Sequence, residues 1–312
     1  MGVFPASSFC LQMLEEGIKK IHLQETIEAL DIAELVQDTM QWRKEEMDMI
    51  VCVKQIPDPE IPPGRFRIDP VAKQAIPPAG VAPIINPYDE RAVELALRVK
   101  EKQGGKITVL TVGKTTSETV VKHALSMGAD DGIILSDQAF EGSDSFGIAY
   151  ILTQAIRKVG SYDLILCGRQ AADWDEGLVG PIIGETLTLP LVTLAVAIDV
   201  AGRELKVKRV TLDGYQVFSV PPPAVVTVSQ EVGRPRLPSG RGIIMAARKQ
   251  VPVWSSKEIG ADPSHMGSKA AQRKVVNLYI PEREKKCEII KGETPGETGA
   301  KLAERLREAG AI

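Results

Sequence analysis

The sequence predicts an α/β fold: a parallel sheet flanked by helices, with an antiparallel hairpin extension and an extended C-terminal arm. The first observation is the alternation of short β-branched runs with helical stretches between residues 49 and 194, which is typical of βαβ units. The second is two-residue periodicity after residue 196, with turns at Ala201-Gly202 and Asp213-Gly214, which favours hairpins. The third is the loss of periodicity beyond residue 233, where Gly, Pro, Arg and Lys accumulate.

The individual elements follow from these patterns. Strands are predicted at 50–54, 106–112, 131–136, 162–167, 191–196 and 224–229. Helices are predicted near 87–103, 117–127, 145–159, 178–187 and 296–309. The first helix has the clearest ends, because Asn86 is suited to cap it, Pro87 suits its first turn, and Gly104-Gly105 terminate it.

Three regions result. Residues 1–47 carry apolar side chains such as Leu14, Ile18, Ile27 and Leu30 at helical spacing among Glu, Gln and Lys, which predicts one or two amphipathic helices. This extension is either a mis-assigned start or a docking element, since Met47 directly precedes the first strand. Residues 48–232 form the predicted α/β domain, and residues 233–312 the arm with its terminal helix.

Composition narrows the class of protein. The 312 residues are 44% apolar, enough for a full α/β core, and the net charge of −3 disfavours nucleic-acid binding, which needs concentrated positive charge. No CxxC pair occurs among Cys10, Cys52, Cys167 and Cys287, which favours reduced thiols over a zinc site or disulfides. No apolar run is long enough to cross a membrane and no signal peptide is recognisable, so we expect a soluble, cytoplasmic protein without membrane insertion.

The most informative stretch is CGRQAADWDEGLVGP, residues 167–181, which follows a predicted strand and precedes a helix. In open parallel sheets, ligands bind at the carboxyl ends of strands, where a helix N-terminus offers free N–H groups to phosphate. Gly168, Gly177 and Gly180 permit close backbone approach. The loop is neither a GxGxxG fingerprint nor a Walker loop, so it indicates a nucleotide site without fixing its type.

Side chains that could perform chemistry are scarce. Asp173, Asp175 and Glu176 suit either metal or acid–base chemistry, or equally the N-terminal end of a helix and solvated surface charge. The three histidines, His22, His123 and His265, show no HExxH spacing and no evident partner in the sequence. We therefore expect no catalytic residue and no metal ligand.

Four segments in this order, VCVKQIPDP (51–59), NPYDERAVELAL (86–97), HALSMGADDGIIL (123–135) and GRQAADWDEGLVGP (168–181), resemble the beta subunits of electron transfer flavoproteins. PAVVTV (223–228), RPR (234–236) and GETPGETGAKLAERL (292–306) continue the similarity. The resemblance implies an adenine-nucleotide alpha-hydrolase-like fold and a heterodimer whose alpha subunit holds most of the FAD. It also implies that this chain holds AMP, or a second FAD in electron-bifurcating members, and is an electron carrier rather than an enzyme.

The resemblance further implies which residues contact the nucleotide. They are Cys52, Asn86, Pro87, Tyr88, Asp89, Val112, Gly168, Arg169, Gln170, Ala171, Ala172, Asp173, Trp174, Asp175, Glu176, Gly177, Leu178 and Val179. Partners implied are the alpha subunit, a dehydrogenase donor, and a quinone-linked or ferredoxin-linked acceptor. Dehydrogenase docking falls on Val232, Gly233, Arg234, Pro235 and Arg236, with Val232 as an apolar anchor, although Val232 equally suits the end of a strand.

Two positions depart from the family pattern. Relatives carry a small polar residue and Gln where this chain has Glu176, Gly177 and Leu178, and a carboxylate beside phosphate is unfavourable, so we expect Glu176 to turn outward. Val210 stands where relatives linked to acyl-CoA dehydrogenases carry an acidic contact. The alternatives are a bifurcating subunit with a second FAD, a stand-alone adenine-nucleotide sensor, which would not need the arm, and a nucleotide-cleaving hydrolase, whose pyrophosphate loop is missing.

Overall fold

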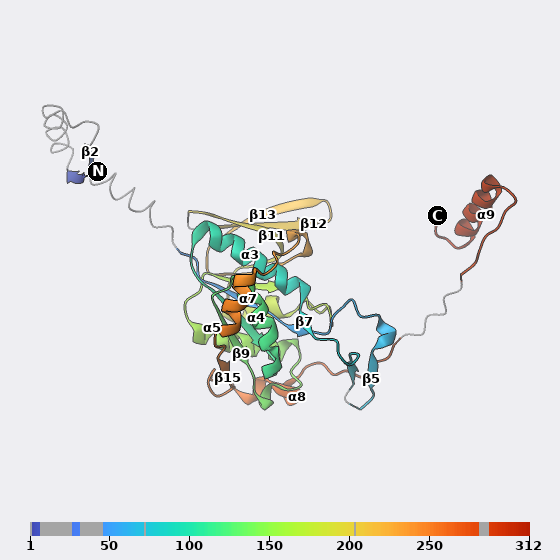
Figure 1. Ribbon diagram of the computed structural model, residues 1–312, viewed down its shortest axis with the longest axis horizontal. Helices are drawn as coiled ribbons and strands as arrows, with labels where there is room; N and C mark the ends of the chain where they lie inside the picture. The colour runs from blue at the N-terminus through green and yellow to red at the C-terminus, as the bar shows by residue number, and fades with distance from the viewer. Residues whose placement is uncertain (1, 7–26, 32–45, 72, 203, 281–286) are drawn as a thin grey trace.

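The computed structural model describes residues 2–6, 27–31, 46–71, 73–202, 204–280 and 287–312 (Figure 1). Its main sheet has nine strands in the order β13-β12-β11-β14-β10-β3-β8-β9-β15. In that order they span Gly214–Val220, Glu204–Thr211, Leu191–Ala201, Ala224–Val228, Leu164–Gly168, Met49–Cys52, Ile107–Val112, Asp131–Leu135 and Val253–Trp254.

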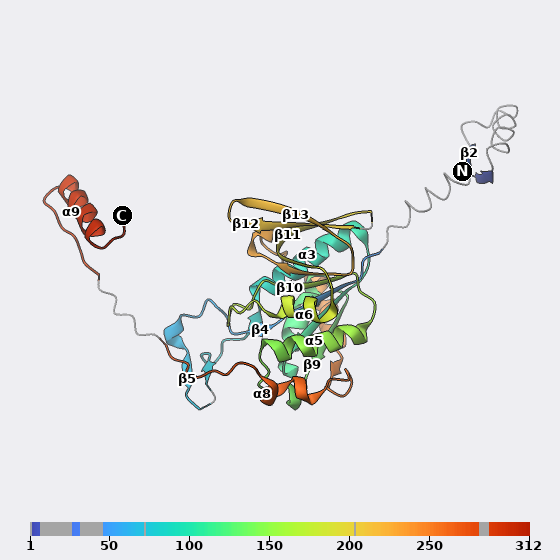
Figure 2. The same cartoon turned by 180° about the vertical axis from the view of Figure 1, so that it is seen from behind.

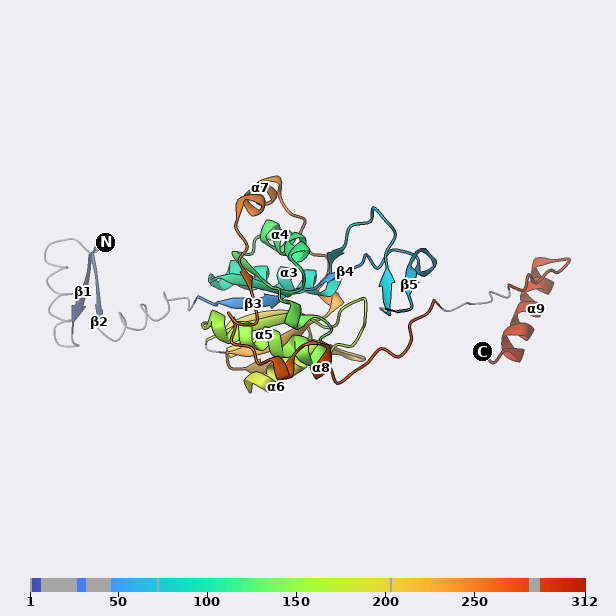
Figure 3. The ribbon, with the colours of Figure 1, turned by 90° about the horizontal axis from the view of Figure 1, so that it is seen from below.

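Helices cover both faces of this sheet. Helices α3 (Pro87–Gln103) and α4 (Glu118–Met127) lie on one face, and α5 (Ser145–Val159) and α6 (Val179–Leu187) on the other (Figure 3). The central strands β3 and β14 are buried along their whole length, as expected of parallel strands covered on both faces. The predicted fold class is confirmed, and each of these four helices lies within one residue of its predicted bounds.

The strand order places a topological switch beside β3. The chain moves outward from β3 to β8 and β9, then returns to form β10 on the opposite side of β3, and all these pairings are parallel. At such a point the loops leaving neighbouring strands diverge and open a crevice at the carboxyl ends. The crevice lies between β3 and β10.

The predicted hairpins extend the sheet on the β14 side. Strand β11 pairs in parallel with β14 and antiparallel with β12, and β12 pairs antiparallel with β13. The register of β11 shifts between Val192 and Ala195 against β14, where Leu194 adopts a φ of 59°. One long strand therefore takes the place of the predicted run at 191–196 and of the first hairpin strand.

The segment after residue 233 is less extended than predicted. Helix α7 (Gly240–Arg248) packs on α4 and β15 pairs with β9, so this part folds back onto the α/β body (Figure 1). The short helix α8 (Gly267–Ala270) follows and is also labelled in the reverse view (Figure 2). Helix α9 (Pro295–Glu308) buries no residue. This part of the chain shows no sequence periodicity, yet some of its apolar residues, such as Ile259 and Met266, are buried in the core beside α5.

Smaller elements complete the described chain. Between β3 and α3, β4 (Gln55–Ile56) pairs with β7 (Ile84–Ile85), and β5 (Arg67–Asp69) pairs with β6 (Gln74–Ile76). The short 3-10 helices are Pro63–Arg65, Thr115–Ser117, Gln138–Phe140, Gln230–Val232 and Pro263–His265. No helix in the described part of the chain is long and apolar enough to span a membrane.

The N-terminal extension is described only in part. Strand β1 (Gly2–Ala6) pairs in parallel with β2 (Ile27–Asp31), so the helical prediction is wrong for Ile27 and Leu30, which belong to a strand. Leu14 and Ile18, on which that prediction also rests, lie outside the described residues.

Candidate functional site

The candidate site is built where β3, β8 and β10 end. Cys52 and Cys167 are directly opposite one another on β3 and β10, and Val112 ends β8. Both thiols are free and buried, and a hydrogen bond with Cys52 that favours the protonated thiol, together with burial, raises the pKa of Cys167 well above its ordinary value. The thiols therefore form part of the apolar floor beneath the loops.

Asp89 joins the two strand ends that flank the crevice. Its Oδ2 accepts the backbone N–H of Lys54 at 2.8 Å and its Oδ1 accepts that of Gly168 at 3.0 Å. The side chain is in the first turn of α3, where the helix dipole favours negative charge. Burial raises the pKa of Asp89 to about 7, although these hydrogen bonds and that of Asn86 act in the opposite direction.

Asn86 fixes the loop that follows β10. Its Nδ2 donates to the carbonyl of Gln170 at 2.8 Å, and its Oδ1 accepts the N–H of Ala172 at 3.1 Å. Asn86 stands at the start of α3, but its side chain makes no capping hydrogen bond, so the prediction that it caps this helix is wrong. The side chain is buried and satisfied by the loop instead.

The same loop is stiffened by contacts of its own. Asp173 receives the Lys54 ammonium at 2.7 Å, and Gln170 Nε2 donates to Asp175 Oδ1 at 2.7 Å. Arg169 lies over the ring of Tyr88, 5.2 Å from its centre, while Trp174 is 53% exposed. Asp173 and Asp175 therefore help to fix this loop.

Two glycines let the loops approach closely. A Cβ at Gly168 would lie 2.4 Å from Asp89 Oδ1 and 2.8 Å from Asp89 N, and one at Gly180 would lie 2.6 Å from Thr227 Cγ2. Gly180 is in the first turn of α6, whose leading N–H groups have no partner within the helix. The backbone of the β10 loop and the start of α6 are therefore packed tightly against the switch point.

The Glu176 side chain has partners in the folded chain and is not a free charge in solvent. Its carboxylate accepts a hydrogen bond from Ser145 Oγ and pairs with Arg273 at 3.0 Å, and the side chain is 25% exposed. Glu176 is therefore a paired charge, because α5 and the C-terminal arm supply partners that the local sequence does not reveal. Its orientation away from a phosphate stays a prediction.

The remaining candidates for chemistry have structural partners. His123 Nε2 lies 2.7 Å from Glu90 Oε1, and His265 stacks on Tyr150 with centroids 5.0 Å apart; His22 and Cys10 lie outside the described residues. Within the described ranges, no group of three His, Cys, Asp or Glu side chains could hold a metal ion.

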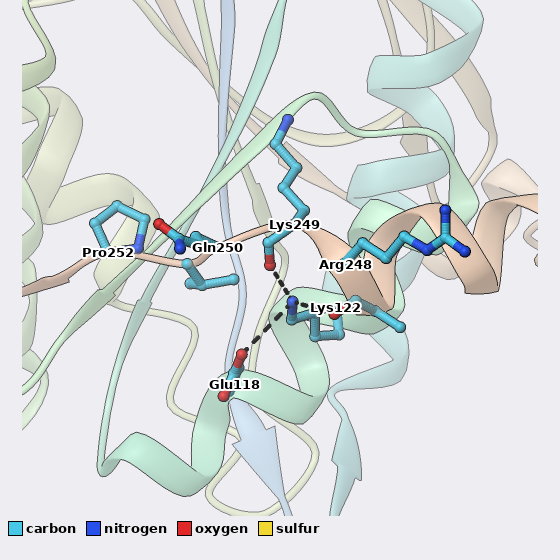
Figure 4. Close-up of a pocket in the computed structure, with 8 residues that line it drawn as sticks. Glu118, Lys122, Arg248, Lys249, Gln250 and Pro252 are labelled. Carbon is cyan, nitrogen blue, oxygen red and sulfur yellow. Dashed lines mark hydrogen bonds and ion pairs between the residues drawn. The ribbon is translucent and has the colours of Figure 1, made fainter.

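A separate surface hollow lies between α4 and residues 247–252 (Figure 4). Its lysine, Lys122, donates to the carbonyls of Ala246 at 2.9 Å and Ala247 at 3.2 Å, and to that of Lys249. Lys122 therefore caps the end of α7 and faces Glu118 at 3.6 Å. None of the residues that line this hollow belongs to the predicted nucleotide site.

Comparison with known proteins identifies the fold's family. The electron transfer flavoprotein domain matches residues 78–259. The chain belongs to the electron transfer flavoprotein family. The electron transfer flavoprotein beta subunit of Thermoanaerobacterium thermosaccharolyticum is 40% identical over 261 residues, which cover 83% of this chain and 98% of the relative. With its fellow beta subunits it confirms the predicted resemblance, and this chain is a beta subunit of that family.

Two other relatives of this flavoprotein subunit carry more specific names. The caffeyl-CoA reductase-Etf complex subunit CarD of Acetobacterium woodii is 35% identical over 263 residues, covering 84% of this chain and 98% of the relative. Protein FixA of Azotobacter vinelandii is 37% identical over 252 residues, covering 78% of this chain and 88% of the relative. Both matches span most of this chain and most of the relative.

The predicted docking segment of this beta subunit is tied to α3. The Glu94 carboxylate forms ion pairs with Arg236 Nε at 2.7 Å and with Arg98 Nε at 2.7 Å, and Arg236 also pairs with Glu101. Burial alone would raise the pKa of Glu94, but the hydrogen bonds from Arg236 and Arg98 hold it below its ordinary value. Sequence reasoning missed this network, since 142 residues separate Glu94 from Arg236.

Val232 is not exposed as an anchor would be. Its side chain is 7% exposed and belongs to the core, and its carbonyl accepts Arg98 NH1 at 3.1 Å. Val232 therefore presents no exposed apolar surface to a partner, and docking on this segment stays a prediction. Of its neighbours, Gly233 and Arg234 are exposed and Pro235 is half-buried.

Replacing Gly168 by Ala should destabilise the domain by about 1–3 kcal/mol, because the added methyl group would overlap Asp89 and force the backbone apart. Gly64→Ala is the matched control, since a Cβ there meets nothing within 4 Å. Urea unfolding of both variants measures the difference, and equal stability of the two would contradict the close packing inferred at Gly168.

Asp89→Asn tests the buried carboxyl. Because the pKa of about 7 in the folded chain lies above the ordinary value of 3.8, the native state binds the proton more tightly. The stability contributed by that proton is present at low pH and is lost as pH rises through about 7. We expect wild type to lose something on the order of a few kcal/mol relative to Asp89→Asn between pH 4 and 8, measured by urea unfolding. A pH-independent difference between the two proteins would disprove this ionisation.

Proposed function

We propose that this beta subunit is a non-catalytic half of a heterodimeric electron transfer flavoprotein. In this proposal the alpha subunit holds most of the FAD, and the present chain holds an adenine nucleotide at the carboxyl ends of β3, β8 and β10. Electrons pass from a dehydrogenase to a quinone-linked or ferredoxin-linked acceptor. The bound flavin would supply the redox chemistry, and this chain would bind and orient.

The observation that carries this proposal is the joining of the loops after β3 and β10 by Asp89 and Asn86. Asp89 joins the backbone at Lys54 to that at Gly168, and Asn86 holds the loop at Gln170 and Ala172. Strand-end amides and a helix N-terminus bind phosphate and adenine without a side-chain acid or base. The close approach at Gly168 and Gly180 fits a nucleotide held by backbone.

A second candidate is a bifurcating subunit that holds FAD in place of AMP. It is supported by the loop sequence GRQAADWDEG and by the similarity to subunit CarD of the caffeyl-CoA reductase-Etf complex and to FixA. The two candidates share the same crevice, because FAD contains an adenosine monophosphate half. The number of flavins in each heterodimer separates them.

We propose that dehydrogenase docking uses the exposed apolar side chains that follow the predicted docking segment. Leu237 is 90% exposed, and Ile243, Ile244 and Met245 on α7 are each more than half exposed. The Glu94 network fixes Arg236 directly before them. Exposed apolar groups rimmed by charges such as Arg241 and Arg248 are suited to a transient interface.

The nucleotide proposal predicts a defined composition of the purified complex. The full chain produced alone should retain no tightly bound FAD, whereas the heterodimer should release one FAD and one AMP, or two FAD in the bifurcating form. Absorbance and chromatography after heat denaturation measure both. Asn86→Ala should lower nucleotide occupancy at least about tenfold, since it removes two loop hydrogen bonds from a buried group. Full occupancy in Asn86→Ala, or FAD bound tightly by the lone chain, would contradict the proposal.

The docking proposal predicts that Ile244→Asp slows electron entry. With the source organism's own dehydrogenase, kcat/KM for flavin reduction should fall about tenfold, because a charge replaces an apolar contact. The flavin content should be unchanged. Val217→Asp is the control, since Val217 is 66% exposed on the distant edge strand β13. Equal rates in both variants would place docking elsewhere.

A further inference from the structure

The C-terminal arm crosses the side of the candidate nucleotide site. We use the name strap for residues 263–275. Met266, within it, is 3% exposed and packs in the core beside α5, and His265 stacks on Tyr150 of that helix. The strap is therefore anchored to the α/β body upstream of the point where it meets the nucleotide loop.

The anchoring continues along the N-terminal end of α5. Asp144 caps this helix by accepting the N–H groups of Phe146 and Gly147 through Oδ1, each at 3.1 Å. Its other oxygen, Oδ2, accepts the backbone N–H of Gln272 at 2.7 Å and that of Arg273 at 3.0 Å. One carboxylate thus fixes the helix and the backbone of the strap together, which places the Arg273 side chain.

Contacts on either side restrict the strap further. Ser143 Oγ accepts the N–H of Gly267 at 2.7 Å, and Lys73, from the loop after β5, donates to the carbonyl of Val275 at 3.0 Å. The strap is consequently held at both ends of the short stretch that carries Arg273. A side chain placed by a fixed backbone loses less conformational entropy when it forms a contact than one on a free chain.

Arg273 meets the nucleotide loop at Glu176. Its guanidinium lies 3.0 Å from Glu176 Oε1, and Ser145 Oγ donates to Oε2 of the same carboxylate. Glu176 directly precedes the positive-φ residue Gly177 and the start of α6, where an anion would meet free N–H groups. An unpaired carboxylate at this point would repel a phosphate, and Arg273 cancels that charge.

We infer that Arg273 is a positioning residue of the nucleotide site, supplied by the C-terminal arm: it neutralises Glu176 and holds the loop 169–178 against the strand ends. This inference rests on the proposed nucleotide site. It assigns Arg273 no direct phosphate contact, because its guanidinium is engaged by Glu176. By linkage, nucleotide binding and attachment of the strap stabilise one another.

A double-mutant cycle in the heterodimer tests this role, with AMP titrated into nucleotide-free Arg273→Met, Glu176→Gln and the double variant. Arg273→Met should weaken AMP binding up to about fivefold, the range of a partly exposed ion pair. In the Glu176→Gln background the same change should have less than about a twofold effect, since no carboxylate is left to neutralise. Lys274→Met, which removes the neighbouring exposed cation, is the matched control and should bind AMP as wild type does.

Two results of the cycle overturn the inference. If Arg273→Met weakens AMP binding equally in the wild-type and Glu176→Gln backgrounds, Arg273 acts on the nucleotide itself. If it does not weaken AMP binding in the wild-type background, the ion pair is a surface contact without consequence for binding. A general loss of folding would instead lower the unfolding midpoint of Arg273→Met well below that of Lys274→Met, so the midpoints of both variants are measured alongside.

A second readout needs no nucleotide. Hydrogen exchange of peptides covering residues 169–178 should be faster in Arg273→Met than in wild type or Lys274→Met, because the loop loses its link to the strap. Unchanged exchange would reject the positioning role. If wild type binds neither AMP nor FAD in this domain, the proposed function fails, while the exchange measurement still decides whether Arg273 holds the loop.

Discussion

The carboxyl group of Asp89 is the interaction on which the arrangement of this subunit depends. It stands at the start of α3 and accepts backbone N–H groups from both sides of the topological switch, at Lys54 and Gly168. An apolar side chain could satisfy neither donor, and either one left buried without a partner would cost free energy. Asn86 directly precedes α3 and Glu94 lies within it, so the position of this helix sets the loop after β10 at one end and the Arg236 segment further along.

Three ion pairs around α3 and the strand ends connect segments that are distant in sequence. Lys54 holds Asp173, Arg236 holds Glu94, and Arg273 holds Glu176. In each pair one partner belongs to a loop, or to the chain after the sheet, and the other to the edge of the crevice or to α3. The segments around Arg236 and Arg273 therefore pack against the α/β body and form part of its structure.

Local sequence predicted the elements well because their signals are local. Pro87 and Gly104 bound α3, and the apolar run at 107–112 is buried almost throughout. The site could be placed at the edge of the sheet from strand polarity and the glycines of one loop. The roles of the side chains could not be predicted from the sequence, because Asn86 and Glu94 bond to residues 84 and 142 positions away. Asn86 was expected to cap its own helix, and only the folded loop shows that Gln170 and Ala172 satisfy it. The burial of Val232 could not be predicted either, since an apolar residue gives no sequence signal of whether neighbouring elements bury it.

The order of strands also constrains how the chain is completed during synthesis. Residues 49–135 supply β3, β8 and β9, but β3 presents an open edge until β10 emerges. Met49 of β3 and its register partner Leu164 of β10 are 115 residues apart in the sequence. Strand β10 in turn lacks its other neighbour until residues 224–228 of β14 follow. Two adjacent, highly apolar strands thus have unpaired edges for much of translation, and such edges are sites of wrong pairing between chains. The hairpin β12–β13 is made before β14, so a locally formed antiparallel unit precedes the central strand that later joins it, through β11, to the rest of the sheet.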